Sequence, residues 1–154
     1  MKKIILAVMM LIGTSTAFAG DSEPLKAILK AQNYAEAANL VQSTLDQLAG
    51  NEEKAKAYNR LYELAMKKVN YEEGIQLENE TQKQMGKEGN KPVDEKGLYA
   101  AVGAAFNSGV EAIKYDNMPN QKGKVKPKYA ALVESVYKLR NDLIYGGVYY
   151  QGKD

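Results

Sequence analysis

The sequence predicts an all-α protein, built as an antiparallel helix-turn-helix stack of about six helices. Two observations indicate this class. Apolar residues recur at spacings of three and four along most of the chain after residue 20, whereas strand-like alternation is lacking. The interruptions between these stretches are short and carry Gly, Pro or Asn. The chain also contains no cysteine, so packing without disulfides must hold the helices together.

Residues 1–19 have the pattern of a cleavable secretory signal peptide. Lys2 and Lys3 precede an apolar run, which ends in small residues and an Ala-x-Ala sequence at Ala19. The run of about ten apolar residues is too short to cross a bilayer core of ~30 Å. Because the chain has no cysteine to acylate, the signal is not of the lipoprotein kind. We therefore expect a signal peptide over residues 1–19, one helical domain over residues 20–154, and a periplasmic or secreted location.

The composition argues against several classes of function. The 21 basic residues include Lys2 and Lys3, without which they equal the 19 acidic residues in number. A near-neutral exported chain gives no electrostatic reason to expect a nucleic-acid partner. The absence of His and Cys removes the usual general base near neutral pH, the thiolate nucleophile and the common zinc ligands. We expect no catalytic residue, no cofactor and no metal.

The first half of the domain predicts four helices. Pro24 is suited to a helix start, and a short apolar stripe follows it. A second helix follows Asn33 and ends near Gly50. A third opens after Asn51, an acceptable N-cap with two glutamates in the first turn, and a weaker fourth begins near Tyr71.

The second half predicts two longer helices. Residues 86–92, GKEGNKP, form the clearest break, and a fifth helix extends from about residue 93 or 94 to 115. Its middle, AAVGAAFNSGVEAI, is rich in small residues that let another helix approach closely, and its polar residues argue against a membrane span. The last helix extends from about Lys128 to Tyr150. It has two apolar rows, which predict burial on two sides: Leu132, Val136, Leu139 and Leu143, and beside them Val133, Tyr137, Ile144 and Val148.

Two similar segments stand at predicted helix junctions. NYAEA (residues 33–37) and NYEEG (residues 70–74) lie at a spacing close to a helix-turn-helix period of about 34 residues. In each, Asn suits a turn, Tyr fills the corner, and the small residue Ala37 or Gly74 lies where two helices approach. The chain here resembles the tetratricopeptide repeat (TPR) family, which implies a TPR-like α-solenoid. Tyr62 departs from that pattern, because a small residue is usual there; an unrelated helical bundle is the alternative.

The tail also resembles that family. Gly146, Tyr149, Tyr150 and Asp154 match its small residue, aromatic pair and turn acid in order, but the Tyr-x-x-Ala that opens the next helix is missing. A helix of this kind buries one side against its partner, so a chain that ends there exposes an apolar face. We expect that the intact protein continues beyond residue 154 or is completed by another molecule. A terminal capping helix is the alternative.

The resemblance implies a concave groove that takes up a protein or peptide partner. It assigns the groove to the third helix and the tail helix, at Asn59, Glu63, Met66, Lys67, Arg140, Gly147 and Tyr150. Arg140 interrupts an apolar row, so it either pairs with a carboxylate inside the stack or faces a ligand. The expected function is protein–protein or peptide binding in the cell envelope, without enzymatic activity. The alternative is a purely structural module of a larger secreted protein.

Two further patterns suggest additional, weaker hypotheses. The loop KGKVKPK (residues 122–128) has lysines at alternate positions; it either docks an anionic partner or is a solvated loop. Four glutamates crowd the fourth helix: Glu72, Glu73, Glu78 and Glu80. Two carboxylates held in a cleft would indicate a glycan-active enzyme, whereas glutamates on an exposed helix face are ordinary.

Overall fold

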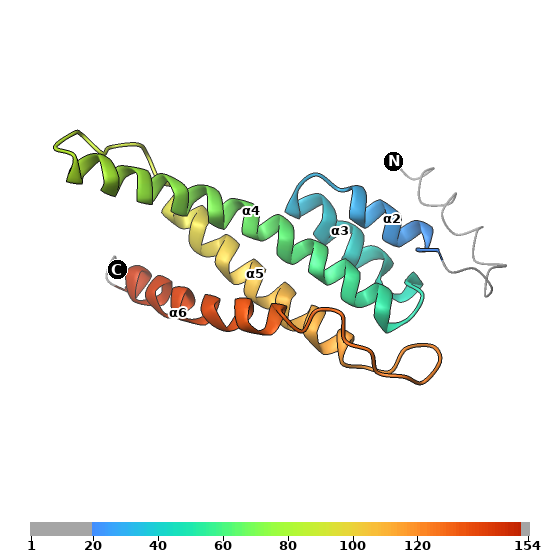
Figure 1. Cartoon of the computed structure of the whole chain (residues 1–154). Helices are drawn as coiled ribbons and strands as arrows, with labels where there is room; N and C mark the ends of the chain where they lie inside the picture. The colour runs from blue at the N-terminus through green and yellow to red at the C-terminus, as the bar shows by residue number, and fades with distance from the viewer. Residues whose placement is uncertain (1–19, 152–154) are drawn as a thin grey trace, which may run out of the picture.

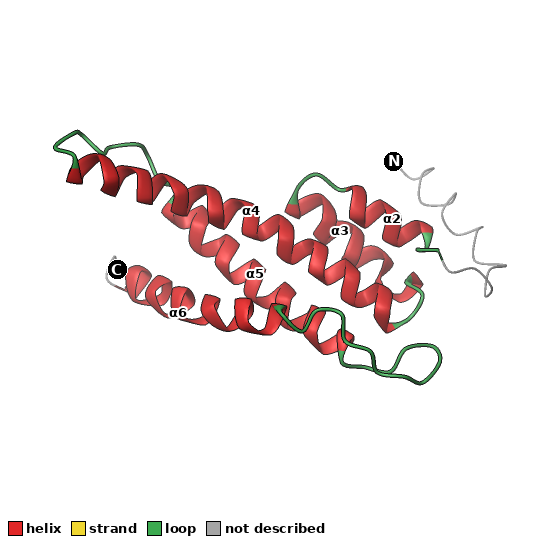
Figure 2. Ribbon diagram, in the orientation of Figure 1, coloured by secondary structure: helices red, strands yellow, loops and turns green. Residues whose placement is uncertain are grey.

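The computed structural model describes residues 20–151, with the side chains of residues 20–145; the predicted signal peptide lies outside this part of the chain. The described residues are helical and contain no strand (Figure 2). The elements follow in the order α2 (Glu23–Lys30), α3 (Tyr34–Thr44), the short 3-10 helix η2 (Leu45–Gln47), α4 (Asn51–Gln84), α5 (Glu95–Asp116) and α6 (Leu132–Gln151). The predicted all-α class is therefore confirmed.

Helix α4 is the central element of the molecule. Figure 1 shows α2 and α3 against its first half, α5 running back along it, and α6 beside α5 on the side away from α2 and α3. One apolar core fills the space between α2, α3 and the start of α4. A second core joins the middle of α4 to α5 and α6. Within residues 20–151, no helix is long and apolar enough to cross a membrane.

The first Asn-Tyr corner is a true turn between two helices. The Asn33 Oδ1 accepts a hydrogen bond of 2.9 Å from the Glu36 backbone N–H, which caps the start of α3. Ala37 is fully buried, as expected for a small residue where two helices approach closely. This part of the predicted corner is confirmed.

The second predicted corner is absent. The predicted third and fourth helices are one continuous helix of 34 residues, and Asn70 and Tyr71 lie inside it. Asn in a helix interior costs less than about 1 kcal/mol relative to Ala, which is too little to end a helix that neighbours support. Val69 and Glu72 are both buried against the α5 side of the molecule, so the packed face of α4 continues through Asn70 without a break.

Helix α4 ends where the clearest break was predicted. Gly86 has a positive φ of 72°, which an L side chain rarely adopts. The Gly86 N–H donates to the Lys83 carbonyl at 3.0 Å, and the Lys87 N–H donates to the Gln82 carbonyl at 2.9 Å. These two bonds form a Schellman motif, which satisfies carbonyls in the last turn of the helix.

Buried carboxylates connect the helices at their ends. Glu53, near the start of α4, accepts hydrogen bonds from the Ser22 N–H at 2.7 Å, the Ser22 hydroxyl at 2.6 Å and the Ala49 N–H at 2.7 Å. Because the Glu53 side chain is buried, these donors replace the water that its charge would otherwise require. The carboxylate thereby ties the start of α2 to the start of α4.

Glu72 plays the same part between α4 and α5. It is only 2% exposed, which corrects the interpretation of this residue as part of an exposed glutamate face. Its carboxylate accepts from the Lys68 ammonium at 2.5 Å and from the Asp94 N–H at 2.9 Å. The hydrogen bond from Lys68, followed by that from the Asp94 backbone, lowers the pKa of Glu72.

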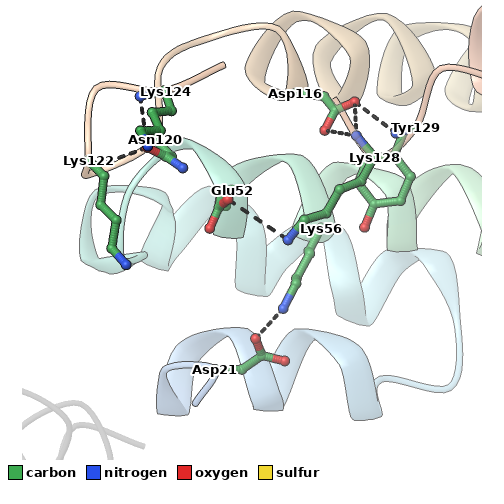
Figure 3. Close-up of polar contacts among 9 residues, drawn as sticks. All are labelled: Asp21, Glu52, Lys56, Asp116, Asn120, Lys122, Lys124, Lys128 and Tyr129. Carbon is green, nitrogen blue, oxygen red and sulfur yellow. Dashed lines mark hydrogen bonds and ion pairs between the residues drawn. The ribbon is translucent and has the colours of Figure 1, made fainter. Parts of the chain in front are cut away.

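Asp116 sets where α6 begins (Figure 3). Its carboxylate accepts the Lys128 N–H at 2.9 Å and the Tyr129 N–H at 2.8 Å, so both residues are held outside the helix. Helix α6 therefore starts at Leu132 and not at Lys128 as predicted. Earlier in the loop, the Asn120 Oδ1 accepts the Lys122 N–H at 2.9 Å. The first part of the lysine loop, as far as Lys124, is therefore a turn.

Helix α6 packs closely on α5 at a glycine. A Cβ atom added at Gly109 would lie 2.3 Å from the Val136 Cγ2 of α6 and 3.3 Å from the Tyr62 Cδ2 of α4. Leu132, Val136 and Leu139 are buried in this contact. Small residues in α5 were predicted to allow a close approach of another helix, and Gly109, within the predicted segment, is such a point of approach to α6.

Candidate functional site: the outer face of helix α6

Helix α6 presents two parallel rows of residues to different surroundings. The row that contains Leu132, Val136 and Leu139 is buried against α4 and α5. The neighbouring row is exposed, with Val133 at 51%, Tyr137 at 65% and Ile144 at 55%. The prediction that both rows are buried is therefore wrong for this row as far as residue 145. We name Val133, Tyr137, Arg140 and Ile144 the α6 face.

The α6 face points away from α4. Asp142, on the same helix, faces α4: the pKa of Glu73 is raised by burial and then by the negative charge of Asp142. Burial also raises the pKa of Asp142 itself. Residues two apart in an α-helix point about 200° away from each other, so Arg140 lies on the side of α6 opposite Asp142. The face is consequently turned toward solvent.

The composition of the α6 face is similar to that of known protein interfaces. It combines two aliphatic side chains, one tyrosine and one arginine, and aromatic residues and arginine are enriched at protein interfaces. Arg140 is exposed and forms no ion pair with a residue of the described part of the chain. Because Arg140 is exposed, the hypothesis that it pairs with a carboxylate inside the stack is wrong for the described residues.

Exposed apolar residues elsewhere do not form such a row. Tyr71 is 64% exposed and Leu77 is 65% exposed, both on α4. Their separation of six residues places them about 240° apart around the helix axis, so they do not share a face. Among the described helices, the aligned exposed row is a property of α6.

The predicted groove residues are divided between two surfaces. Asn59, Glu63 and Lys67 lie along one side of α4, where the Asn59 amide donates to the Glu63 carboxylate at 2.9 Å. Met66 is half-buried and packs against the core that includes Leu139 of α6. Arg140, on α6, is exposed and belongs to the α6 face. Gly147 and Tyr150 lie outside the residues whose side chains are described.

The clustered glutamates have different surroundings. Glu72 is bound by Lys68, and Glu78 pairs with Lys91 at 2.5 Å. Glu73 faces Asp142 across the contact between α4 and α6. Sequence reasoning missed this pair, because residues so far apart in the chain become neighbours only through helix packing. Within residues 20–151, no three Asp or Glu residues are grouped so that they could hold a metal ion.

No family model, curated protein or solved structure matches the chain. The described residues define the class of protein: an all-α bundle, anchored by buried carboxylates, with an aligned row of exposed apolar residues on helix α6.

Proposed function

We propose that the chain is an exported, non-enzymatic helical protein that binds a protein or peptide partner in the cell envelope through the α6 face. The observation that carries this proposal is the alignment of Val133, Tyr137 and Ile144 in one exposed row. Isolated exposed apolar residues are normal on any protein, whereas a contiguous apolar surface bordered by polar residues marks an interaction site.

The spacing of the face favours a helical partner. Its residues follow one another at intervals of four, three and four, which is the spacing of a helix-pairing seam. An amphipathic helix laid along it would cover Val133 and Ile144, while Tyr137 and Arg140 would supply hydrogen bonds that set its orientation.

The contacts that hold the first half of α6 support this role. Asp116 binds the backbone just before the helix, and Val136 holds the helix against α5 at Gly109. A preformed surface loses little conformational freedom when it binds, so more of the contact energy is left for affinity.

Two parts of the proposal rest on the sequence. Export rests on the signal-peptide pattern of residues 1–19. A TPR-like solenoid stays a prediction: the Asn33 corner favours it, and the continuous helix through Asn70 counts against it. The second candidate, a structural module of a larger secreted protein, also accounts for an apolar face, which the rest of that protein would then cover.

A site-specific cross-linker tests the proposed surface. A photoreactive phenylalanine analogue replaces Tyr137 in one variant and Ser135 in a matched control. Ser135 is also exposed on α6 but points about 200° away from Tyr137. After irradiation in living cells, we expect a discrete protein adduct from position 137 and none from position 135. Absence of an adduct from position 137, or equal adducts from both positions, would contradict the proposal.

A further inference from the structure

We infer that the partner of the α6 face is a second copy of this chain, paired with it antiparallel about a two-fold axis. The inference rests on the proposed function, since it names the occupant of the same surface. Four exposed residues carry it: Val133, Tyr137, Arg140 and Ile144.

The α6 face is complementary to an antiparallel copy of itself. A two-fold axis crossing α6 between Lys138 and Leu139 places Val133 opposite Ile144 of the second copy, and Tyr137 opposite Arg140 of the second copy. Each pair occurs twice by symmetry, as an isologous interface requires. The first pair is aliphatic against aliphatic. The second places a guanidinium beside a tyrosine ring, where the ring quadrupole attracts the cation.

The charge of Arg140 favours the antiparallel pair of helices over a parallel pair. A parallel pair of α6 helices would place Arg140 against Arg140 of the second copy, and two like charges in one seam repel each other. The antiparallel arrangement separates the two arginines and gives each a tyrosine. The flank of the face adds no net charge, because Glu134 and Lys138 are already paired on the same helix at 2.9 Å.

The size of the surface predicts a weak dimer. Covering the α6 face and its margins on both copies would bury on the order of 1,000 Å² in total, which is the range of transient complexes. We therefore expect dissociation in the micromolar range, with monomer and dimer exchanging. A reversible dimer of this strength would respond to the local concentration of the protein.

Sedimentation velocity tests the association. For the full chain exported and purified, we expect the weight-average sedimentation coefficient to rise between about 5 and 500 µM. The variants Ile144→Lys and Arg140→Glu should abolish this rise, and Ser135→Lys, on the opposite side of α6, should retain it. Far-UV circular dichroism of all variants checks that they are folded. A wild-type chain that stays monomeric over the whole range would overturn the inference.

Disulfide trapping tests the register. The chain has no cysteine of its own, so single cysteines can be introduced without interference. In the antiparallel pair, Val133→Cys and Ile144→Cys lie opposite each other, whereas like positions are about 16 Å apart along the helix axis. Mild oxidation of the two variants mixed in equal amounts should give mainly the mixed dimer. Dimers that form equally well in each variant alone would indicate a parallel pair and overturn the register.

The two proposals fail in different ways. One outcome is that the purified chain stays monomeric while the photoreactive residue at position 137 joins it to a different protein. In that case the α6 face binds a partner, and the inferred dimer is wrong. If the purified chain stays monomeric and position 137 gives no adduct, both the proposed function and the second copy are wrong.

Discussion

Two glycines on α5 should respond in opposite ways to the same substitution. A Cβ at Gly109 would lie 2.3 Å from the Val136 Cγ2, whereas a Cβ at Gly103 would meet only the Leu143 Cδ2 at 3.8 Å, an ordinary contact. Replacing glycine by alanine inside a helix stabilises it by about 1 kcal/mol when nothing else changes. Gly103→Ala should therefore raise the free energy of unfolding by up to about 1 kcal/mol.

Gly109→Ala adds an overpacking cost to the same gain. Val136 is β-branched and has one strongly preferred rotamer in a helix, so its methyl group cannot rotate away and α6 must shift. Overpacking of this kind costs about 2 kcal/mol, which leaves a net loss of about 1 kcal/mol. With a urea m-value of about 1.5 kcal/mol/M, the unfolding midpoint should fall by roughly 0.7 M.

Urea unfolding followed by far-UV circular dichroism measures both variants. The double variant Gly109→Ala/Val136→Ala supplies the control, because removing the methyl groups of Val136 relieves the clash. Its destabilisation should be smaller than the sum of the two single variants. If Gly109→Ala stabilises the protein as much as Gly103→Ala, the described contact of α6 with α5 at Gly109 is wrong.

Four other predictions concern the buried carboxylates, the charges and the end of helix α4. Glu53→Ala leaves three donors unsatisfied and should lower the free energy of unfolding by about 2–4 kcal/mol, whereas Glu52→Ala should change it by less than about 0.5 kcal/mol; urea unfolding distinguishes them. Burial raises the pKa of Asp142, so its charged form is unfavourable in the native state. Asp142→Asn should therefore raise the melting temperature at neutral pH. The gain should shrink as the pH falls below the pKa of the folded state and vanish below the pKa of the unfolded state. The pKa of Glu72 is lowered by Lys68, so Glu72→Gln should be less stable than the wild type at neutral pH, and this deficit should be lost in acid. Melting temperatures measured from pH 7 to 3 test both variants. If Asp142→Asn and Glu72→Gln change the melting temperature at neutral pH in the same direction, the reasoning is wrong. Gly86→Ala should cost about 1 kcal/mol in the same urea assay because of the positive φ, and an unchanged midpoint would argue against the described helix end.

The candidate site was only partly predictable. The second apolar row of the last helix could be predicted from the spacing of Val133, Tyr137 and Ile144, but its exposure could not, since burial on two sides was expected. The side to which Arg140 points could not be read, because it depends on which row of α6 meets α5. The groove drawn from the family resemblance combined this arginine with Asn59 of α4, although the two residues lie on different surfaces.

The all-α class, the turn at Asn33 and the end of α4 at Gly86 could all be predicted from the sequence. These features depend on local interactions: a side-chain cap, a positive φ and the spacing of apolar residues within one helix. Only the tertiary structure decided that α4 continues through Asn70, that Glu72 is buried and that one row of α6 stays exposed. The physical reason is that the same amphipathic pattern allows several packings, and the contacts between helices that are distant in sequence select one of them.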